Sequence, residues 1–237
     1  MIRDYVCVDI ETSGIRAKWD KIIEIGAVKV RDGEVVDTFS QLIYPGIKVS
    51  SFITQLTGIT DKMLEGKPNI SEVMPRFVEF AQDDYLLGHN IMFDYSFLKQ
   101  SAMNLNLAFE KSGMDTLKIA RKTLPNLESR ALDYLCSYFG IPDEHHHRAL
   151  NDAQVTSRLY LILMEQFGRE LPELFEAHPL NYRVKKMQPI TERQKQYLKA
   201  LISRHHLVAD FDIETLTKSE ASKKIDKILS VYGRIFD

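Results

Sequence analysis

The sequence predicts an α/β protein in which a mixed sheet is covered by helices, followed by a small all-helical module. Three observations lead to this fold class. The first third of the chain carries strand patterns, the middle alternates helical periodicity with a short apolar strand, and the end holds two further helix patterns. With 237 residues, 44% of them hydrophobic, the chain can bury one substantial core and leave a second, smaller unit over.

The strand patterns open the chain. They are YVCVDI at residues 5–10, IIEIGAVKV at 22–30 and EVVDTFSQLIYP at 34–45. The second and third are separated by RDG, which is typical of a tight hairpin. The sequence therefore predicts an antiparallel meander at the start of the domain.

Helical periodicity follows the meander. The predicted elements are a helix at 70–81, a strand YLLGH at 85–89, and helices at 92–103, 115–123, 130–139 and 149–167. Helices that alternate with strands after a meander predict the mixed sheet with helical layers.

A domain boundary is predicted in AHPLNYRVKKMQPI, residues 177–190, where two prolines bracket a basic, weakly patterned stretch. We expect one domain at residues 1–180 and a small helical module of unknown role at 188–237. The capping signals of its two helices are Thr191 for the first, Thr217 or Ser219 for the second, and Gly233 at the end.

Charge is distributed unevenly between the two parts. Residues 1–182 carry 19 basic and 26 acidic side chains, whereas residues 183–237 carry 12 and 7. A basic end on an acidic body is consistent with a polyanionic partner, and equally with a solvated helical surface.

No signal peptide or membrane span is expected, because the N-terminus turns acidic early and LYLILM is the densest apolar run. We therefore expect a cytoplasmic protein that does not bind membranes. Cys7 and Cys136 are expected to be core residues without a disulfide.

Two acids end the first strand. Side chains two apart on a strand share a face, so Asp9 and Glu11 point the same way. Neighbouring carboxylates repel each other, and a divalent cation with oxygen ligands relieves that repulsion. The alternative is a chance D-x-E in which Asp9 caps a turn.

A third acid follows the short apolar strand pattern at residues 85–89. In GHNIMFDYSFL, residues 88–98, Asp94 falls in the first turn of a helix, at the sheet edge where α/β proteins bind ligands. It can instead serve the helix dipole. His89 and Asn90 precede it and either donate hydrogen bonds to a phosphate or sugar, or satisfy the turn backbone.

A histidine and a fourth acid occur in HHHRALNDAQVT, residues 145–156. On one continuous helix His147 and Asp152 would lie about 140° apart, so we place His147 on the loop before the helix. From there it can accept a proton from water, since imidazole titrates near neutrality. His145 and His146 are expected to be exposed polar residues.

Three of these segments, DIETSG, GHNIMFDYSFL and HRALNDA, resemble in order and separation the motifs of the DEDDh 3′-5′ exonucleases. That family includes the proofreading epsilon subunit of bacterial DNA polymerase III and ribonuclease T. The resemblance covers roughly residues 4–167, and TQLTGIT at 54–60 and LDYLCSYFGIP at 132–142 add to it. It implies a ribonuclease H-like fold with a mixed five-stranded sheet.

The resemblance also implies the roles of the site residues. Asp9, Glu11, Asp94 and Asp152 would hold two Mg²⁺ or Mn²⁺ ions, with His147 as general base. Asp9 would bridge the ions, Glu11 and Asp152 would complete the site of the attacking water, and Asp94 the site beside the departing 3′ oxygen. The product would be a nucleoside 5′-monophosphate cut from a 3′ end.

Substrate contacts are implied as well. Thr12 and Gly14 would hold the terminal 3′-hydroxyl, with the small Gly14 permitting close approach. Leu56, Phe93 and Phe97 would offer apolar surface to the last bases. Phe93 and Phe97, four apart on a helix, fit the core as well.

Three readings remain open at this point. The first is a metal-dependent 3′-5′ exonuclease that acts on single-stranded or frayed DNA ends in replication, repair or proofreading. The second is an RNA-trimming ribonuclease with the same site, and the third a non-catalytic, polymerase-associated nucleic-acid-binding subunit. Within residues 188–237, the lysines either grip nucleic acid or leave the module free to dock a DNA polymerase or another replication or repair protein. These are Lys195, Lys199, Lys223, Lys224 and Lys227.

Overall fold

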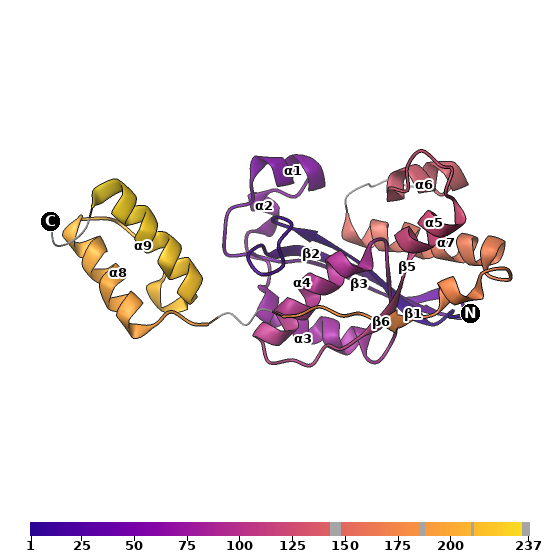
Figure 1. Ribbon diagram of the computed structural model, residues 1–237, viewed down its shortest axis with the longest axis horizontal. Coiled ribbons are helices and arrows are strands. Elements are labelled where there is room, and N and C mark those ends of the chain that lie inside the picture. Colours follow the sequence, from indigo (N-terminus) through magenta and orange to yellow (C-terminus); the bar gives the residue numbers. More distant parts are fainter. Residues whose placement is uncertain (143–147, 185–187, 210, 234–237) are drawn as a thin grey trace. The chain divides into compact units, whose positions relative to one another are not determined.

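The computed structural model describes residues 1–142, 148–184, 188–209 and 211–233. The chain divides into two compact units, Met1–Val184 and Lys185–Asp237 (Figure 1).

The first unit is built on a mixed, six-stranded sheet in the order β3-β2-β1-β4-β5-β6. Its strands are β1 (Tyr5–Thr12), β2 (Ile22–Arg31), β3 (Glu34–Leu42), β4 (Leu86–Gly88), β5 (Ser112–Asp115) and β6 (His178–Pro179). β1 to β3 form the antiparallel meander, β4 and β5 run parallel to β1, and β6 is antiparallel to β5. The meander and the mixed sheet are thus confirmed.

The sheet has one strand more than the five that the resemblance implied. β5 has four residues, and the additional strand β6 has two, one of them a proline. Segments this short are too brief to show an alternation of apolar and polar residues, so no sequence pattern predicts them.

Helices cover both faces of the sheet (Figure 1). They are α1 (Ser51–Thr57), α2 (Asp61–Leu64), α3 (Ile70–Ala81), α4 (Ile91–Asn104), α5 (Thr116–Thr123), α6 (Leu132–Phe139) and α7 (Ala149–Phe167), with a 3₁₀ turn η1 (Pro172–Phe175). Within the part of the chain that the structure describes, no helix is both long enough and apolar enough to cross a bilayer.

Alternation along β1 divides its side chains between two cores. Val6, Val8 and Ile10 pack with α3 and α4, whereas Tyr5 and Cys7 pack with α5, α6 and α7. Since side chains two apart share a face, Asp9 and Glu11 lie on the side of the sheet that α7 covers. Both Cys7 and Cys136 are buried, as expected of core residues.

The second unit is a helical pair, α8 (Glu192–Arg204) and α9 (Lys218–Tyr232), with a 3₁₀ turn η2 (Ile213–Thr215). Each helix begins with a reciprocal capping box, Thr191 with Gln194 and Thr217 with Glu220. Thr217, rather than Ser219, is therefore the second N-cap. The unit has its own small core, which includes Leu198, Leu201, Leu216, Ala221 and Ile225.

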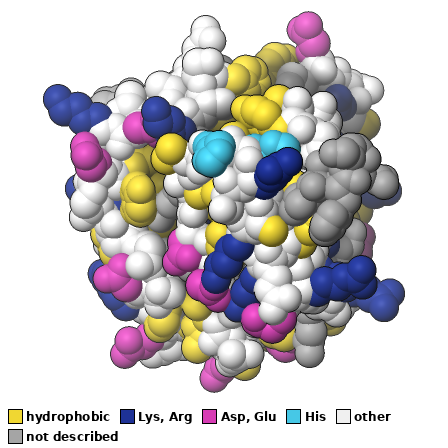
Figure 2. Space-filling model, turned by 90° about the vertical axis from the view of Figure 1, so that its left-hand side faces the viewer, with side chains coloured by type: hydrophobic (Ala, Val, Ile, Leu, Met, Phe, Trp, Pro, Cys, Tyr) yellow, Lys and Arg dark blue, Asp and Glu magenta, His cyan; other side chains and the backbone are white. Residues whose placement is uncertain are grey.

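Several of the lysines considered for nucleic acid are engaged within this unit. Lys195 and Lys199 both pair with Glu214, at 2.6 and 3.0 Å, and the ammonium of Lys224 lies 3.5 Å from the ring centre of Phe211. Seen from the side of α8 and α9, Lys and Arg side chains are interspersed with Asp and Glu rather than gathered together (Figure 2). Among the described side chains on this face, the basic ones are therefore mixed with acidic ones.

Candidate active site

The central strand carries the first two acids of the site. At its end, Asp9 and Glu11 lie on the α7 side of the sheet, both half-buried. Asp152, in the first turn of α7, joins them. One carboxylate oxygen from each of these three residues lies within 4.8 Å of the others, an arrangement able to hold a metal ion.

Asp94 approaches the same strand from α4. It lies in the first turn of that helix and is buried. Its Oδ1 accepts a hydrogen bond of 3.1 Å from the backbone N–H of Ile10, the residue between the two strand acids. The start of α4 is thereby tied to the end of β1, and the structure brings all four predicted acids into one region.

Burial and mutual repulsion make the ionised form of this cluster energetically unfavourable. Burial raises the pKa of Asp9 well above its usual range, and the charges of Asp94 and Asp152 add to the effect. Burial, followed by the charges of Asp152 and Glu24, raises the pKa of Glu11 to about 8. Burial likewise raises the pKa of Asp94, although its bond from Ile10 opposes the shift. A cation placed among these groups would favour their ionisation.

This repulsion predicts a pH dependence of stability without divalent ions. Because Glu11 holds its proton more tightly in the folded than in the unfolded chain, its contribution to the free energy of unfolding is largest below about pH 4.5 and falls as the pH rises toward about 8. We expect the melting temperature with chelator to drop across this range relative to a Glu11→Gln variant. Mn²⁺ is expected to remove the difference. Parallel melting curves for both proteins, with and without Mn²⁺, would contradict the assignment.

The two residues expected at the 3′-hydroxyl lie just beyond the acids. The hydroxyl of Thr12 donates to the backbone carbonyl of Gly14, at 2.6 Å. A Cβ added at Gly14 would meet the carboxylate of Asp20 at 2.6 to 3.0 Å. A larger residue at this position would therefore displace the Asp20 side chain.

The turn before α4 is held by the protein's own groups. Nδ1 of His89 lies 2.9 Å from Oγ1 of Thr116, and Nε2 lies 2.9 Å from the carbonyl of Arg130. Both ring nitrogens are therefore occupied, and the prediction that His89 donates to a substrate finds no support in this geometry. Burial also lowers the pKa of His89, which favours the neutral ring. Asn90, in contrast, is exposed and takes a left-handed conformation at φ 70°.

The apolar residues predicted to meet the bases differ in exposure. Phe97 is buried in the core between the sheet and α4, so it offers no surface to a base. Phe93 packs on it, with ring centres 5.2 Å apart, and is half-buried. Leu56 is 46% exposed on α1, and Phe52, four residues earlier, is 69% exposed. The spacing of Phe52 and Leu56 places both on one side of α1, so Phe52 is an exposed apolar neighbour of Leu56 that we did not predict.

His147 lies outside the described residues, as do His145 and His146. The loop position expected for the general base is consequently an inference from the sequence. The described chain resumes at Arg148, immediately before α7.

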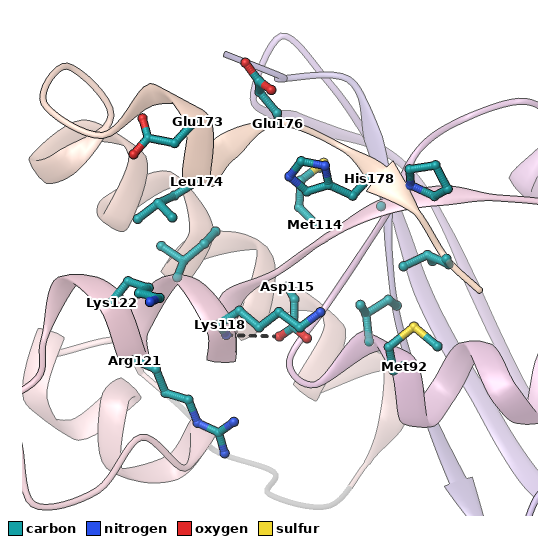
Figure 3. A pocket seen from close by; sticks show the side chains of 15 residues that line it. Met92, Met114, Asp115, Lys118, Arg121, Lys122, Glu173, Leu174, Glu176 and His178 are labelled. Atoms are coloured by element: carbon teal, nitrogen blue, oxygen red, sulfur yellow. Dashed lines mark hydrogen bonds between the residues drawn. The ribbon is translucent and has the colours of Figure 1, made fainter. Parts of the chain in front are cut away.

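A cavity of about 350 Å³ lies at the sheet edge, between α4, α5 and the segment leading into β6 (Figure 3). Its lining includes Met92, Met114 and Leu174 with Lys118 and Lys122. Of the described residues that line it, none belongs to the four-acid cluster. The four-acid cluster at the end of β1 therefore lies outside this cavity.

Asp115 connects the cavity wall to the turn before α4. Its Oδ1 accepts hydrogen bonds from the backbone N–H groups of Asn90 at 3.0 Å and Leu117 at 3.0 Å. One carboxylate thus caps α5 and fixes the residue that precedes α4. We did not predict this connection, because an acid at a helix start normally indicates only a local cap.

A carboxylate cluster at the end of a central strand of a mixed α/β sheet is the kind of donor set that divalent-metal nucleases use. A sequence model of the family described as Exonuclease matches residues 6–160. The chain belongs to this exonuclease family.

Curated relatives place the same segment inside much longer proteins. The chain is 40% identical over 178 residues to a DNA polymerase III PolC-type of Clostridium perfringens, covering 75% of this chain and 12% of that protein. It is 43% identical over 163 residues to the PolC-type polymerase of Caldanaerobacter subterraneus, covering 69% of this chain and 12% of that protein. The chain thus spans about an eighth of the length of these relatives.

Solved structures show the same architecture. Exonuclease X in complex with 5′ overhanging duplex DNA superposes with a TM-score of 0.58 at 27% identity, covering 69% of this chain and 93% of that chain. The zinc-bound complex of E. coli exonuclease I with single-stranded DNA gives a TM-score of 0.66 at 18% identity, covering 74% and 43%. At that identity the second comparison shows the fold alone.

Proposed function

We propose that residues 1–180 form a metal-dependent 3′-5′ exonuclease, which removes nucleoside 5′-monophosphates from the 3′ ends of single-stranded DNA. The observation that carries this proposal is the convergence of Asp9, Glu11 and Asp152 within 4.8 Å, with Asp94 bonded to the strand between the first two. The family membership and the fold shared with exonuclease X support it.

The donor set fits a hard divalent cation. All of its groups are carboxylates, and Mg²⁺ and Mn²⁺ prefer oxygen ligands. Their raised pKa values show that the cluster is unfavourable as a set of bare anions. We infer that Asp9, Glu11, Asp94 and Asp152 hold two such ions. When bound, the ions supply an activated water and stabilise the charge that develops on the departing oxygen.

Side chains of the protein orient the substrate and deprotonate the attacking water. Asp9 is close enough to Asp94 and to Asp152 for both charges to act on it, so it would contribute to both ion positions. His147, on the segment that leads into α7, accepts the proton of the attacking water. Thr12 and Gly14, directly after the strand acids, hold the terminal 3′-hydroxyl, and exposed Leu56 packs against a terminal base.

DNA is favoured over RNA by the relatives. The curated relatives are DNA polymerases by name, and exonuclease X is described bound to DNA. A polymerase is accordingly the protein partner that we propose, for proofreading or repair, with residues 188–237 as the candidate docking module.

The reaction is tested with 5′-end-labelled single- and double-stranded DNA and RNA, each incubated with Mg²⁺, Mn²⁺ or chelator. We expect a ladder that shortens from the 3′ end, released 5′-monophosphates, and no reaction with chelator. A labelled mononucleotide as the first product would show that degradation starts at the 5′ end, which contradicts the proposal. Degradation of RNA alone would favour the RNA-trimming ribonuclease. Binding of nucleic acid without any cleavage would favour the non-catalytic subunit.

Deletion of residues 188–237 is expected to leave hydrolysis of short oligonucleotides essentially unchanged. Each unit has its own hydrophobic core, so the first should fold without the second. Circular dichroism and the ladder assay on the truncated chain check this. An unfolded or inert product would show that the second unit is not a separate module.

A further inference from the structure

Glu24 is a buried acid in the second strand that the four-acid site does not use. It lies directly opposite Glu11 in the antiparallel pair of β1 and β2, and its side chain is 1% exposed. Its carboxylate binds two groups at the start of α7. Oε1 accepts from Nη2 of Arg148 at 2.8 Å, and Oε2 accepts from the backbone N–H of Ala149 at 3.2 Å.

Gly26 brings the same strand into contact with the same helix end. It lies two residues after Glu24, hence on the same face, and opposite Asp9. A Cβ at this position would come closer than 3.0 Å to the backbone of Ala149 and Leu150. The first turn of α7 therefore rests on the backbone of β2. We call Glu24 and Gly26 the helix seat.

The helix seat replaces a local cap. The N-cap residue of α7 is Arg148, whose side chain has no acceptor atom and cannot bind the free N–H groups of the first turn as Ser, Thr, Asp or Asn does. Glu24 supplies that acceptor from another element, and its negative charge suits a helix N-terminus. Asp152 belongs to the same turn, three residues after Ala149.

Keeping an acid here carries an electrostatic cost, because Glu24 stands beside Glu11. Arg148 offsets part of it, since its guanidinium lowers the pKa of Glu11 while Glu24 raises it. A neutral acceptor would hold the Ala149 N–H without this repulsion. An acid at position 24 also forms the ion pair with Arg148, which a neutral acceptor would not form.

We propose that Glu24 is a positioning residue: together with Gly26 it fixes the first turn of α7, and so sets where Asp152 meets Asp9 and Glu11. The inference rests on the proposed function, in which Asp152 is a metal ligand. A group that orients a ligand in this way typically changes metal affinity by about 10- to 100-fold when it is removed.

The test measures Mn²⁺ affinity by calorimetry without nucleic acid, together with kcat and KM on a DNA oligonucleotide. We expect Glu24→Ala to weaken Mn²⁺ binding by about 10- to 100-fold and to lower kcat, with KM nearly unchanged. Glu24→Gln, which keeps one acceptor oxygen, should lose less. A matched control is Asp84→Ala, which breaks an ion pair of the same 2.8 Å length at the opposite end of β2, with Arg31. It should retain wild-type Mn²⁺ affinity and kcat.

Two further variants keep the test decisive if Glu24→Ala does not fold. The side chain of Arg148 is 44% exposed, so Arg148→Ala should fold, and we expect it to weaken Mn²⁺ binding without raising KM. Gly26→Ala should also weaken Mn²⁺ binding, because the first turn of α7 must shift away from the added Cβ.

Folded variants at Glu24 or Arg148 that bind Mn²⁺ like the wild type would overturn the proposal. A rise in KM alone would also overturn it, because the pair would then contact the DNA strand. A wild-type chain that binds no Mn²⁺ would refute the proposed function and the positioning role with it. Wild-type binding with unaltered variants would refute the positioning role alone.

Discussion

Asp152→Asn is expected to lower the rate of DNA hydrolysis by about 10³-fold or more while leaving the fold intact. Asn keeps the size of the side chain but removes one negative charge from a cluster whose oxygens lie within 4.8 Å of one another. Loss of about 4 kcal/mol of transition-state stabilisation corresponds to a rate lower by about 10³-fold, within the several kcal/mol that a catalytic metal supplies. Single-turnover hydrolysis of an end-labelled oligonucleotide measures this change.

A matched control is available in α6. Asp133 also lies in the first turn of its helix but is exposed, so Asp133→Asn should retain full activity. Without metal, Asp152→Asn should be at least as stable as the wild type, because it relieves repulsion on Asp9 and Glu11. Near-normal hydrolysis by Asp152→Asn would remove this residue from the site.

His147→Ala is expected to lower kcat by about 10²- to 10⁴-fold, the usual contribution of a general base, with little change in KM. The base acts on the attacking water and not on the strand, so substrate affinity should persist. Steady-state kinetics on a single-stranded oligonucleotide separate the two parameters.

The neighbouring histidines provide controls within the same tract. His145→Ala and His146→Ala remove similar rings from adjacent positions that we expect to be exposed, and both should retain the wild-type kcat. Equal losses in kcat and in substrate affinity for His147→Ala, or equal effects of all three substitutions, would argue against a specific proton acceptor at His147.

The acids were predictable because regular elements fix where they point. The alternation of a strand places Asp9 and Glu11 on one face whatever the rest of the fold does. Asp94 and Asp152 each lie in the first turn of a helix, and the structure brings both helix starts to the end of β1. Local patterns therefore indicated the acids one by one, and the resemblance to the exonuclease motifs joined them into one cluster.

Side chains near the acids were less predictable, because their partners come from distant segments. His89 is held by Thr116 and by Arg130, 27 and 41 residues further along the chain. Phe97 faces the core rather than the substrate, as its helical spacing also allowed. Neither the hydrogen-bond partners of His89 nor the orientation of Phe97 can be predicted from a local sequence pattern.

Glu24 illustrates a signal that was present but not used. It is the one acid within IIEIGAVKV, where every other residue except a glycine and a lysine is apolar. A lone charge in a strand that is otherwise buried requires a partner, and here that partner is 124 residues away. The identity of the partner followed only from the fold.

The central claim is that divalent cations make this cluster of carboxylates stable and catalytic. A crystal of the full chain soaked in MnCl₂, measured at the manganese absorption edge, tests it most directly. We expect anomalous density for Mn²⁺ in direct contact with carboxylate oxygens of Asp9, Glu11 and Asp152, with a second peak beside Asp94. Ordered carboxylates without manganese density between them would contradict the claim.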